Sequence, residues 1–337
     1  MDAGDRDLRW GIIGCGNVTE VKSGPAFRKA AHSTLVAVMR RDAAKARDYA
    51  QRHGVPRWYD DAAALVADAE VDAVYVATPP STHKHYALMG IAAGKPVYVE
   101  KPMAMDSSEC GEIVRAARTA GVPVFVAYYR RALPRFAKVR ELLFDERAIG
   151  NPRAVHAVYA KPHHPRYDDP QGSHWHVRPE ISGGGLFVDV GCHTLDILDW
   201  LFGPIVRVDG QASNQRGSYA AEDSVAMSFA FGNGMPGTGL WIFDSLQRQD
   251  SIEVIGDAGR LSLAIFGDGP IRLENAAGVR ELHVGNPPHI QQPLIETIVR
   301  ELRGEAGACP SSAESAARTT WAIDEVLRDY RRMAGRV

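Results

Sequence analysis

A short apolar run, Leu8 to Ile13, leads directly into the glycine-rich sequence Gly14-Cys15-Gly16-Asn17-Val18. A strand that ends in such a turn and is followed by a helical pattern is typical of dinucleotide-binding units. Gly14 and Gly16 would let the backbone approach a pyrophosphate, which the start of the next helix attracts electrostatically. Thr19 replaces the third glycine of the usual pattern. The alternative is a tight turn that binds no ligand.

Strand and helix patterns alternate as far as residue 127, which indicates a parallel sheet with crossover helices. Further strands are predicted over 34–39, 71–77, 96–99 and 123–127. Helices are predicted from the glycine turn to about Ala31 and over 42–52, 81–93 and 107–120.

Beyond residue 127 the pattern changes to strands at short spacing, which favours antiparallel pairing. These strands are predicted over 154–159, 205–212, 224–231, 237–243, 251–255, 260–265 and 271–274. Helices are predicted over 134–144, 185–202, 292–303 and 313–334, and a polar loop rich in His and Pro over 160–182. The chain therefore reads as an α/β protein with an N-terminal Rossmann domain, 1–127, and a C-terminal α/β domain, 128–337.

Composition excludes several classes of protein. The 337 residues are 45% hydrophobic with a formal net charge of −2, which points to neither nucleic acid nor an anionic membrane as partner. No apolar run reaches the length of a membrane span, and the acidic start lacks the apolar stretch of a signal peptide. The four scattered cysteines read as free thiols. We therefore expect a cytoplasmic protein.

The tripeptide Glu100-Lys101-Pro102 ends an apolar strand with a lysine. A buried ammonium group costs several kcal/mol unless it is paired or used. Pro102 ends the strand and restricts Lys101 to extended geometry. Ligands bind at the carboxyl ends of strands in open α/β sheets, so Lys101 is a candidate for contact with a ligand.

Two arginines, Arg40 and Arg41, follow the second predicted strand, where sites that prefer NAD usually carry an acidic residue. Arginine suits a 2′-phosphate or stacking on adenine, so the sequence favours NADP over NAD. The alternative is two solvated arginines at a helix start.

Asp189 and His193 are four residues apart in a predicted helix that follows three glycines, and so share a face with Asp196 close by. A carboxylate one turn from a histidine is a candidate catalytic pair, although a lone helical histidine is more often structural. The other histidines show no metal-ligand spacing, so no metal site is expected. Trp175 and His176 could line a substrate pocket, because tryptophan offers an apolar face to a sugar ring.

Together these motifs resemble the Gfo/Idh/MocA family, which includes glucose–fructose oxidoreductase and inositol dehydrogenase. The resemblance rests on the glycine turn, on Thr78-Pro79-Pro80 with His83, on Glu100-Lys101-Pro102, and on Gly184-Gly185 with Asp189, His193 and Asp196. It implies a Rossmann domain and a second domain on an open, mostly antiparallel sheet, which in many relatives supports a homodimer or homotetramer.

The resemblance also implies functional residues. Lys101, Asp189 and His193 would form the catalytic site, and Tyr128 and Arg130 lie where relatives contact substrate or nicotinamide, although the usual Asn-x-Arg-Phe pattern is absent. Asp189, His193, Trp175 and His176 complete the expected substrate set. The expected cofactor contacts are Gly14, Gly16, Asn17, Val18, Arg40, Arg41, Thr78, Pro79, His83, Glu100 and Lys101.

These residues predict hydride transfer between NADP or NAD and a carbinol or carbonyl carbon of a sugar, polyol or related cyclic diol. His193 would act as general acid and base, Lys101 would stabilise the developing alkoxide, and Asp189 would orient both His193 and the substrate hydroxyl. Two alternatives remain open: a redox-neutral enzyme that uses bound NAD, as in glycoside cleavage, and a cofactor-binding regulator without catalysis.

Overall fold

The computed structural model describes residues 6–168 and 174–335, which form two compact units. The first unit takes the described residues up to Leu133 together with Pro287–Ala317. The second unit takes Pro134–Asn286 and the described residues from Arg318 onward. Sequence alone assigned residues 287–317 to the domain 128–337, whereas by their contacts they belong to the first unit.

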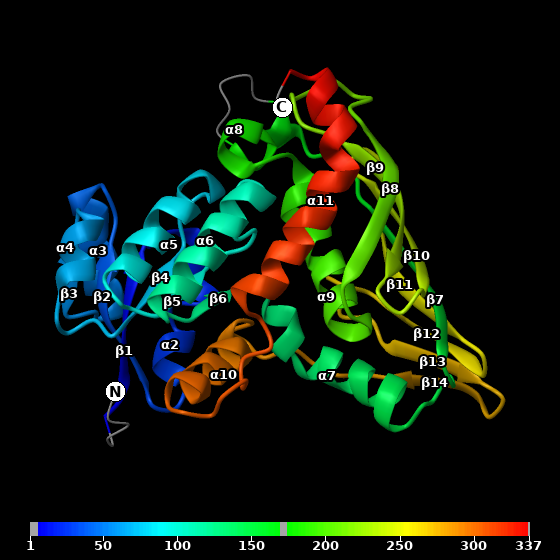
Figure 1. Ribbon diagram of the computed structural model, residues 1–337, viewed down its shortest axis with the longest axis horizontal. Helices are drawn as coiled ribbons and strands as arrows, with labels where there is room; N and C mark the ends of the chain where they lie inside the picture. The colour runs from blue at the N-terminus through cyan, green and yellow to red at the C-terminus, as the bar shows by residue number, and fades with distance from the viewer. Residues whose placement is uncertain (1–5, 169–173, 336–337) are drawn as a thin grey trace. The chain divides into compact units, whose positions relative to one another are not determined.

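Six parallel strands form the sheet of the first unit, in the order β3-β2-β1-β4-β5-β6 (Figure 1). This is the strand order 3-2-1-4-5-6 of dinucleotide-binding folds, in which ligands bind at the carboxyl ends where the order reverses, here between β1 and β4. The strands are β1 (Leu8–Ile13), β2 (Ser33–Met39), β3 (Arg57–Tyr59), β4 (Ala73–Val76), β5 (Val97–Val99) and β6 (Val124–Val126).

Helices bury both faces of this sheet, which explains why its central strands are continuous apolar runs. On one face, the α-carbon of Gly11 lies so close to Leu65 that a Cβ there would be 2.7 Å from the leucine Cδ2. Elsewhere in the core, Trp10 and Phe27 lie 4.9 Å apart, measured between ring centroids. The helices are α1 (Asn17–Val21), α2 (Ala26–Lys29), α3 (Ala43–His53), α4 (Ala62–Ala67), α5 (His83–Ala92) and α6 (Ser107–Ala120).

Two predictions for this unit were wrong in detail. The single helix expected to reach Ala31 is split into α1 and α2, because Pro25 has no N–H to donate and Gly24 packs against the backbone carbonyl of Thr19. The edge strand β3 was missed, since three half-buried residues give no readable alternation.

A late segment of the chain returns to the first unit. Helix α10 (Gln292–Leu302) contacts α2 and the short 3₁₀ turn η2 (Tyr129–Ala132). Ser311 donates a 2.8 Å hydrogen bond to the carbonyl of Val126 at the end of β6. These contacts explain why residues 287–317 are part of this unit.

The second unit is built on an eight-stranded sheet in the order β14-β13-β12-β11-β7-β10-β9-β8, antiparallel except where β7 and β10 pair in parallel (Figure 1). The fold class predicted from sequence is thus confirmed, although β14 was missed. The strands are β7 (Pro152–Ala160), β8 (Ile205–Ser213), β9 (Ser224–Phe231), β10 (Pro236–Ile242), β11 (Gln249–Gly256), β12 (Gly259–Leu263), β13 (Ile271–Asn275) and β14 (Gly278–Leu282).

One face of this sheet is covered and the other is polar. Helix α9 (Cys192–Phe202) places Phe202 5.5 Å from Phe231 of β9, and α11 (Ala313–Met333) packs Val326 against Gly210 of β8. Exposed residues such as His156 and Thr238, joined by a 2.7 Å hydrogen bond, lie on the opposite face. Strands of this sheet therefore alternate buried and exposed residues.

The segment before α9 departs from the predicted helix. Residues Phe187–Gly191 form a π-helical turn, η6, before the α-helix begins at Cys192. Helix α7 (Pro134–Arg140) likewise ends in a π-helical turn, Glu141–Asp145. Short π segments inside helices occur frequently at functional sites.

The loop expected over 160–182 includes short helical segments. It contains the 3₁₀ turns η4 (Pro165–Tyr167) and η5 (Trp175–Val177) and the short helix α8 (Pro179–Ser182), while residues 169–173 lie outside the described residues. No helix in the described part of the chain has the length and apolar character to cross a membrane.

Candidate active site

The glycine turn joins β1 to α1 at the switch point of the first sheet. Gly14 has φ +93°, and a Cβ there would lie 2.7 Å from Thr78 Cγ2 and 3.0 Å from the backbone of Ala77. The N–H groups of Gly14 and Cys15 donate to the carbonyl of Met39, at 2.9 and 3.1 Å. Only glycine fits this position, and the resulting turn is a bare backbone surface of the kind that suits a pyrophosphate.

Thr19, which replaces the third glycine, is fully buried and serves the turn. Its hydroxyl donates to the carbonyl of Gly16 at 2.8 Å, and its own carbonyl accepts a 2.8 Å hydrogen bond from Tyr49 of α3. Asn17 is exposed and Val18 half-buried at the start of α1. The departure from the usual pattern therefore leaves the turn intact.

Arg40 and Arg41 are both exposed just after β2. Arg40 Nη1 donates to the carbonyl oxygen of Cys15 at 3.3 Å, so its guanidinium lies at the glycine turn. Asp42 is the only acid close by in sequence, and it caps α3 by accepting a 3.2 Å hydrogen bond from the backbone N–H of Lys45. Of the charged residues that directly follow β2, Arg40 is therefore the one whose side chain contacts the glycine turn.

The segment after β4 carries Thr78 and Pro79. Thr82 donates to the hydroxyl of Thr78 at 2.8 Å, while His83 is fully buried. The two ring nitrogens of His83 lie 2.8 Å from the carbonyl oxygen of Pro102 and 2.7 Å from that of Thr78. Burial lowers the pKa of His83, although both carbonyls favour the charged form. His83, expected as a cofactor contact, instead ties together the loops after β4 and β5.

Glu100 is likewise engaged within the protein. Its carboxylate accepts hydrogen bonds from the Tyr75 hydroxyl at 2.6 Å, from Gln291 Nε2 at 2.7 Å and from the backbone N–H of Lys101 at 3.2 Å. Gln291 also accepts a 2.8 Å bond from Tyr98. Glu100 therefore fixes the backbone from which the half-buried Lys101 projects, a role that sequence reasoning did not assign to it.

Tyr128 and Arg130 follow β6. Tyr128 is fully buried, and Arg130 is 6% exposed with its guanidinium carbon 5.0 Å from the ring centroid of Tyr129. Both side chains are therefore largely buried.

Asp189 and His193 lie in the second unit, in and just after the π turn. Asp189 is half-buried, whereas His193 is 5% exposed, with its ring 5.8 Å from that of Phe266. Asp196, on the next turn, is buried. A π turn has more residues per turn than an α-helix, yet a separation of four residues still keeps Asp189 and His193 about one turn apart.

The glycines before this segment are required by close packing. A Cβ on Gly185 would lie 2.7 Å from Ala221 and 2.8 Å from the carbonyl of Glu222, and the N–H of Gly185 donates to the Glu222 carboxylate at 2.8 Å. Burial raises the pKa of Glu222. The glycines thus seat the Asp189 segment against the loop before β9.

Trp175 and His176 stack on each other with ring centroids 3.8 Å apart and remain half-buried. Lys161, just after β7 in the same unit, was missed by sequence reasoning. Burial lowers the pKa of Lys161, and the negative charge of Asp189 partly offsets this effect. The described residues hold no group of three or more His, Cys, Asp or Glu side chains arranged for a metal.

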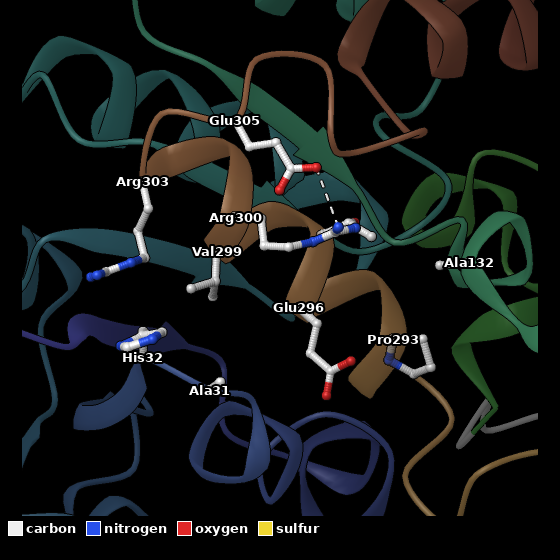
Figure 2. Close-up of a pocket in the computed structure, with 10 residues that line it drawn as sticks. Ala31, His32, Ala132, Pro293, Glu296, Val299, Arg300, Arg303 and Glu305 are labelled. Atoms are coloured by element: carbon white, nitrogen blue, oxygen red, sulfur yellow. Dashed lines mark hydrogen bonds and ion pairs between the residues drawn. The ribbon is translucent and has the colours of Figure 1, made fainter. Parts of the chain in front are cut away.

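A separate pocket of about 650 Å³ lies in the first unit, between α10 and the residues before β2. Figure 2 shows His32, Glu296 and Arg300 around it, with Arg300 paired to Glu305 at 3.3 Å. His32 directly precedes β2, so this pocket lies at the amino ends of the parallel strands. The glycine turn and Lys101 lie at their carboxyl ends, and the pocket is therefore not the expected cofactor site.

The fold and its motifs define a dinucleotide-binding oxidoreductase. The model of the oxidoreductase family with an NAD-binding Rossmann fold matches residues 8–128, and that of the GFO/IDH/MocA C-terminal domain matches residues 136–262. The chain belongs to the Gfo/Idh/MocA family, and it is an enzyme of the NAD(P)-dependent dehydrogenase and reductase class.

Similar proteins include oxidoreductase P35 of Formosa agariphila, 39% identical over 94% of this chain and 97% of the relative. The 1,5-anhydro-D-fructose reductase of Ensifer adhaerens is 31% identical over 88% of each chain. Among solved structures, the aldose–aldose oxidoreductase of Caulobacter crescentus in complex with glycerol has a TM-score of 0.84, with 22% identity over 97% of this chain and 98% of that chain. That likeness shows a shared fold.

Proposed function

We propose that this enzyme transfers a hydride between NADP and a carbinol or carbonyl carbon of a sugar, polyol or related cyclic diol. The observation that carries the proposal is the Gly14 turn at the switch point of the first sheet, where a Cβ would collide with Thr78. The sugar reductase activity named for the Ensifer adhaerens relative supports the substrate class.

The bare backbone at Gly14 and Gly16 would hold the cofactor pyrophosphate, with Thr78 and Pro79 beside it. Arg40 would bind the 2′-phosphate, because its guanidinium is a cation that lies at the glycine turn. When bound, the cofactor supplies a nicotinamide carbon that gives or accepts the hydride.

Lys101, Asp189 and His193 would be the catalytic residues. His193 would take the proton of the substrate hydroxyl in oxidation and return it in reduction. Lys101 would donate to the same oxygen and stabilise the alkoxide as it forms, and Asp189 would orient His193 and the substrate. Glu100 would position Lys101 through its hydrogen bond to the Lys101 N–H.

Trp175 and His176 would line the substrate pocket, with the apolar face of the tryptophan toward a sugar ring. The polar, uncovered face of the eight-stranded sheet would form the interface of a homodimer or homotetramer. A cytoplasmic location is part of the same proposal.

The test is a panel of sugars, polyols and cyclic diols, assayed in both directions at 340 nm with NAD(H) and NADP(H). The proposal expects an absorbance change with members of the panel and a higher kcat/KM with NADP(H). Tight cofactor binding with no absorbance change, together with cleavage of aryl glycosides, would instead identify a redox-neutral enzyme.

A further inference from the structure

Lys161 is held in a defined position just after the end of β7, an interior strand of the second sheet. Its N–H donates to the carbonyl of Ile242 at 2.9 Å, and its carbonyl accepts a 3.1 Å hydrogen bond from the N–H of Ser245. Its backbone N–H is thus tied to the last residue of β10, the parallel neighbour of β7, and its carbonyl to the segment that follows β10. The side chain therefore leaves a rigid part of the fold and not a loose loop.

Two aromatic rings enclose the ammonium group of Lys161. Its Nζ lies 5.5 Å from the ring centroid of Tyr167 and 5.4 Å from that of Phe243. Such contacts are worth about 0.5–2 kcal/mol each, which is less than the cost of removing an ammonium group from water. The rings position the charge without neutralising it.

Two arginines and one acid act electrostatically on Lys161. Within residues 6–168 and 174–335, no ion pair or hydrogen bond is made by its ammonium group. Arg166 stacks on the same Tyr167 ring at 4.7 Å and donates to its hydroxyl at 2.6 Å. The positive charges of Arg166 and Arg248 both act on Lys161, and Asp189 is the acid whose charge opposes them. Lys161 and Arg166 thus place two positive charges at the ring of Tyr167, which is a favourable setting for an anion.

A series of ring contacts within the second unit leads from Lys161 to His193. Phe243, which faces the ammonium group, lies 6.0 Å from Tyr159, and Tyr159 lies 5.1 Å from Phe266. Phe266 in turn lies 5.8 Å from His193. The cation and the candidate acid–base are therefore joined by one continuous series of packed rings, in which Phe243 and Tyr159 are buried and Phe266 is half-buried.

We propose that Lys161 is an anion subsite for the substrate, so that the enzyme acts on sugars that carry a carboxylate or a phosphate ester in preference to neutral sugars and polyols. This inference rests on the proposed function, because it places the anionic end of the substrate on Lys161 and the reacting carbon near His193. Arg166 and Arg248 add positive potential that attracts the anion.

The experiment compares glucose, glucuronate and glucose 6-phosphate, and the corresponding galactose series, as substrates of the wild type, Lys161→Met, Lys161→Arg and Lys138→Met. Lys138→Met is the matched control. Lys138 forms ion pairs with Glu141 and Glu146 and is not one of the residues in the aromatic contacts described above. The kcat/KM values for the carboxylate sugar and for the phosphate ester are determined separately, so that the preferred anion is identified.

The wild type is expected to prefer one anionic sugar over its neutral counterpart by at least about tenfold in kcat/KM. In Lys161→Met this preference should disappear through a higher KM for the acid, while kcat/KM for the neutral sugar stays within about threefold. Lys161→Arg should retain part of the preference, and Lys138→Met all of it. The thermal midpoint of each variant shows that it is folded.

Turnover of neutral sugars alone, or an equal loss for both kinds in Lys161→Met, would overturn the inference and leave the proposed function standing. If no sugar is turned over, titration calorimetry of the same sugars into the NADP-loaded protein decides. Weaker binding of the acid in Lys161→Met would then support the subsite and count against the proposed reaction. Equal binding of acid and neutral sugar by the wild type would refute the subsite.

Discussion

Arg40 donates a hydrogen bond of 3.3 Å from Nη1 to the carbonyl oxygen of Cys15, in the centre of the glycine turn. An exposed arginine would be free to extend into water, but this one is directed toward the proposed position of the cofactor. Asp42, the next residue but one, accepts a hydrogen bond from the backbone N–H of Lys45 at the start of α3. The cofactor preference of the enzyme should therefore depend on Arg40.

Replacing Arg40 with aspartate should reverse that preference. The variant loses the cation that would bind a 2′-phosphate and gains an acid that repels it and accepts from ribose hydroxyls. We expect the ratio of kcat/KM for NADP to that for NAD to fall by at least about tenfold, or about 1.4 kcal/mol. Arg47→Ala, on the outer part of α3, is the control and should leave the ratio unchanged. A ratio unaffected by Arg40→Asp would mean that Arg40 is only a surface residue.

Gly14→Ala should weaken the binding of NADP, whereas the matched variant Gly94→Ala should not. Gly14 and Gly94 both have positive φ, +93° and +70°, so alanine strains the backbone at either position. A Cβ at Gly14 meets Thr78 and Ala77, whereas at Gly94 nothing lies within 4 Å. Titration calorimetry should show a rise in the Kd for NADP of at least about tenfold for Gly14→Ala and little change for Gly94→Ala. Equal Kd values for the two variants would exclude the turn as the pyrophosphate site.

Acid should destabilise the first unit through Asp72. Burial alone would raise the pKa of this carboxyl, but hydrogen bonds from Arg9 and Arg6 outweigh it and hold the pKa well below its usual range. A folded-state pKa below the unfolded value of about 3.9 means stability that is present above that pH and is lost as pH falls toward the folded-state pKa.

Asp72→Asn should therefore lower the free energy of unfolding at pH 7 by about 2 kcal/mol, since hydrogen bonds to a charged group are lost. The difference from wild type should shrink as the pH falls from about 5 toward 2, because the carboxyl of Asp72 is protonated first in the unfolded wild type, while the folded-state carboxyl stays ionised until lower pH. Urea unfolding at a series of pH values measures this. A difference that stays constant over that range would show that the charge of Asp72 does not contribute.

Sequence alone predicted those site residues whose type has a single physical explanation at their position. Gly14 stands where only glycine fits, and Lys101 follows an apolar strand that otherwise excludes charge. His83 and Glu100 were assigned to the cofactor from their motifs, but hydrogen bonds to Pro102 and Tyr75 are invisible until the fold brings these residues together.

Other features could not be read because their signal is not local. The π turn Phe187–Gly191 has the same apolar pattern as an α-helix, so the sequence predicted one continuous helix. The surroundings of Lys161 include Phe243, which follows β10 and is far from Lys161 in the sequence. The edge strands β3 and β14 lack the burial that marks a strand.

The central claim is that Lys101 acts in the reaction and not merely in the fold, and Lys101→Ala tests it most directly. The measurement is kcat for a sugar or polyol substrate, with the Kd for NADP determined on the same protein. We predict that kcat falls by about 10²–10⁴-fold, as expected for loss of a group that stabilises developing charge, while the Kd changes by less than about threefold. An unchanged kcat in the folded variant would contradict the account.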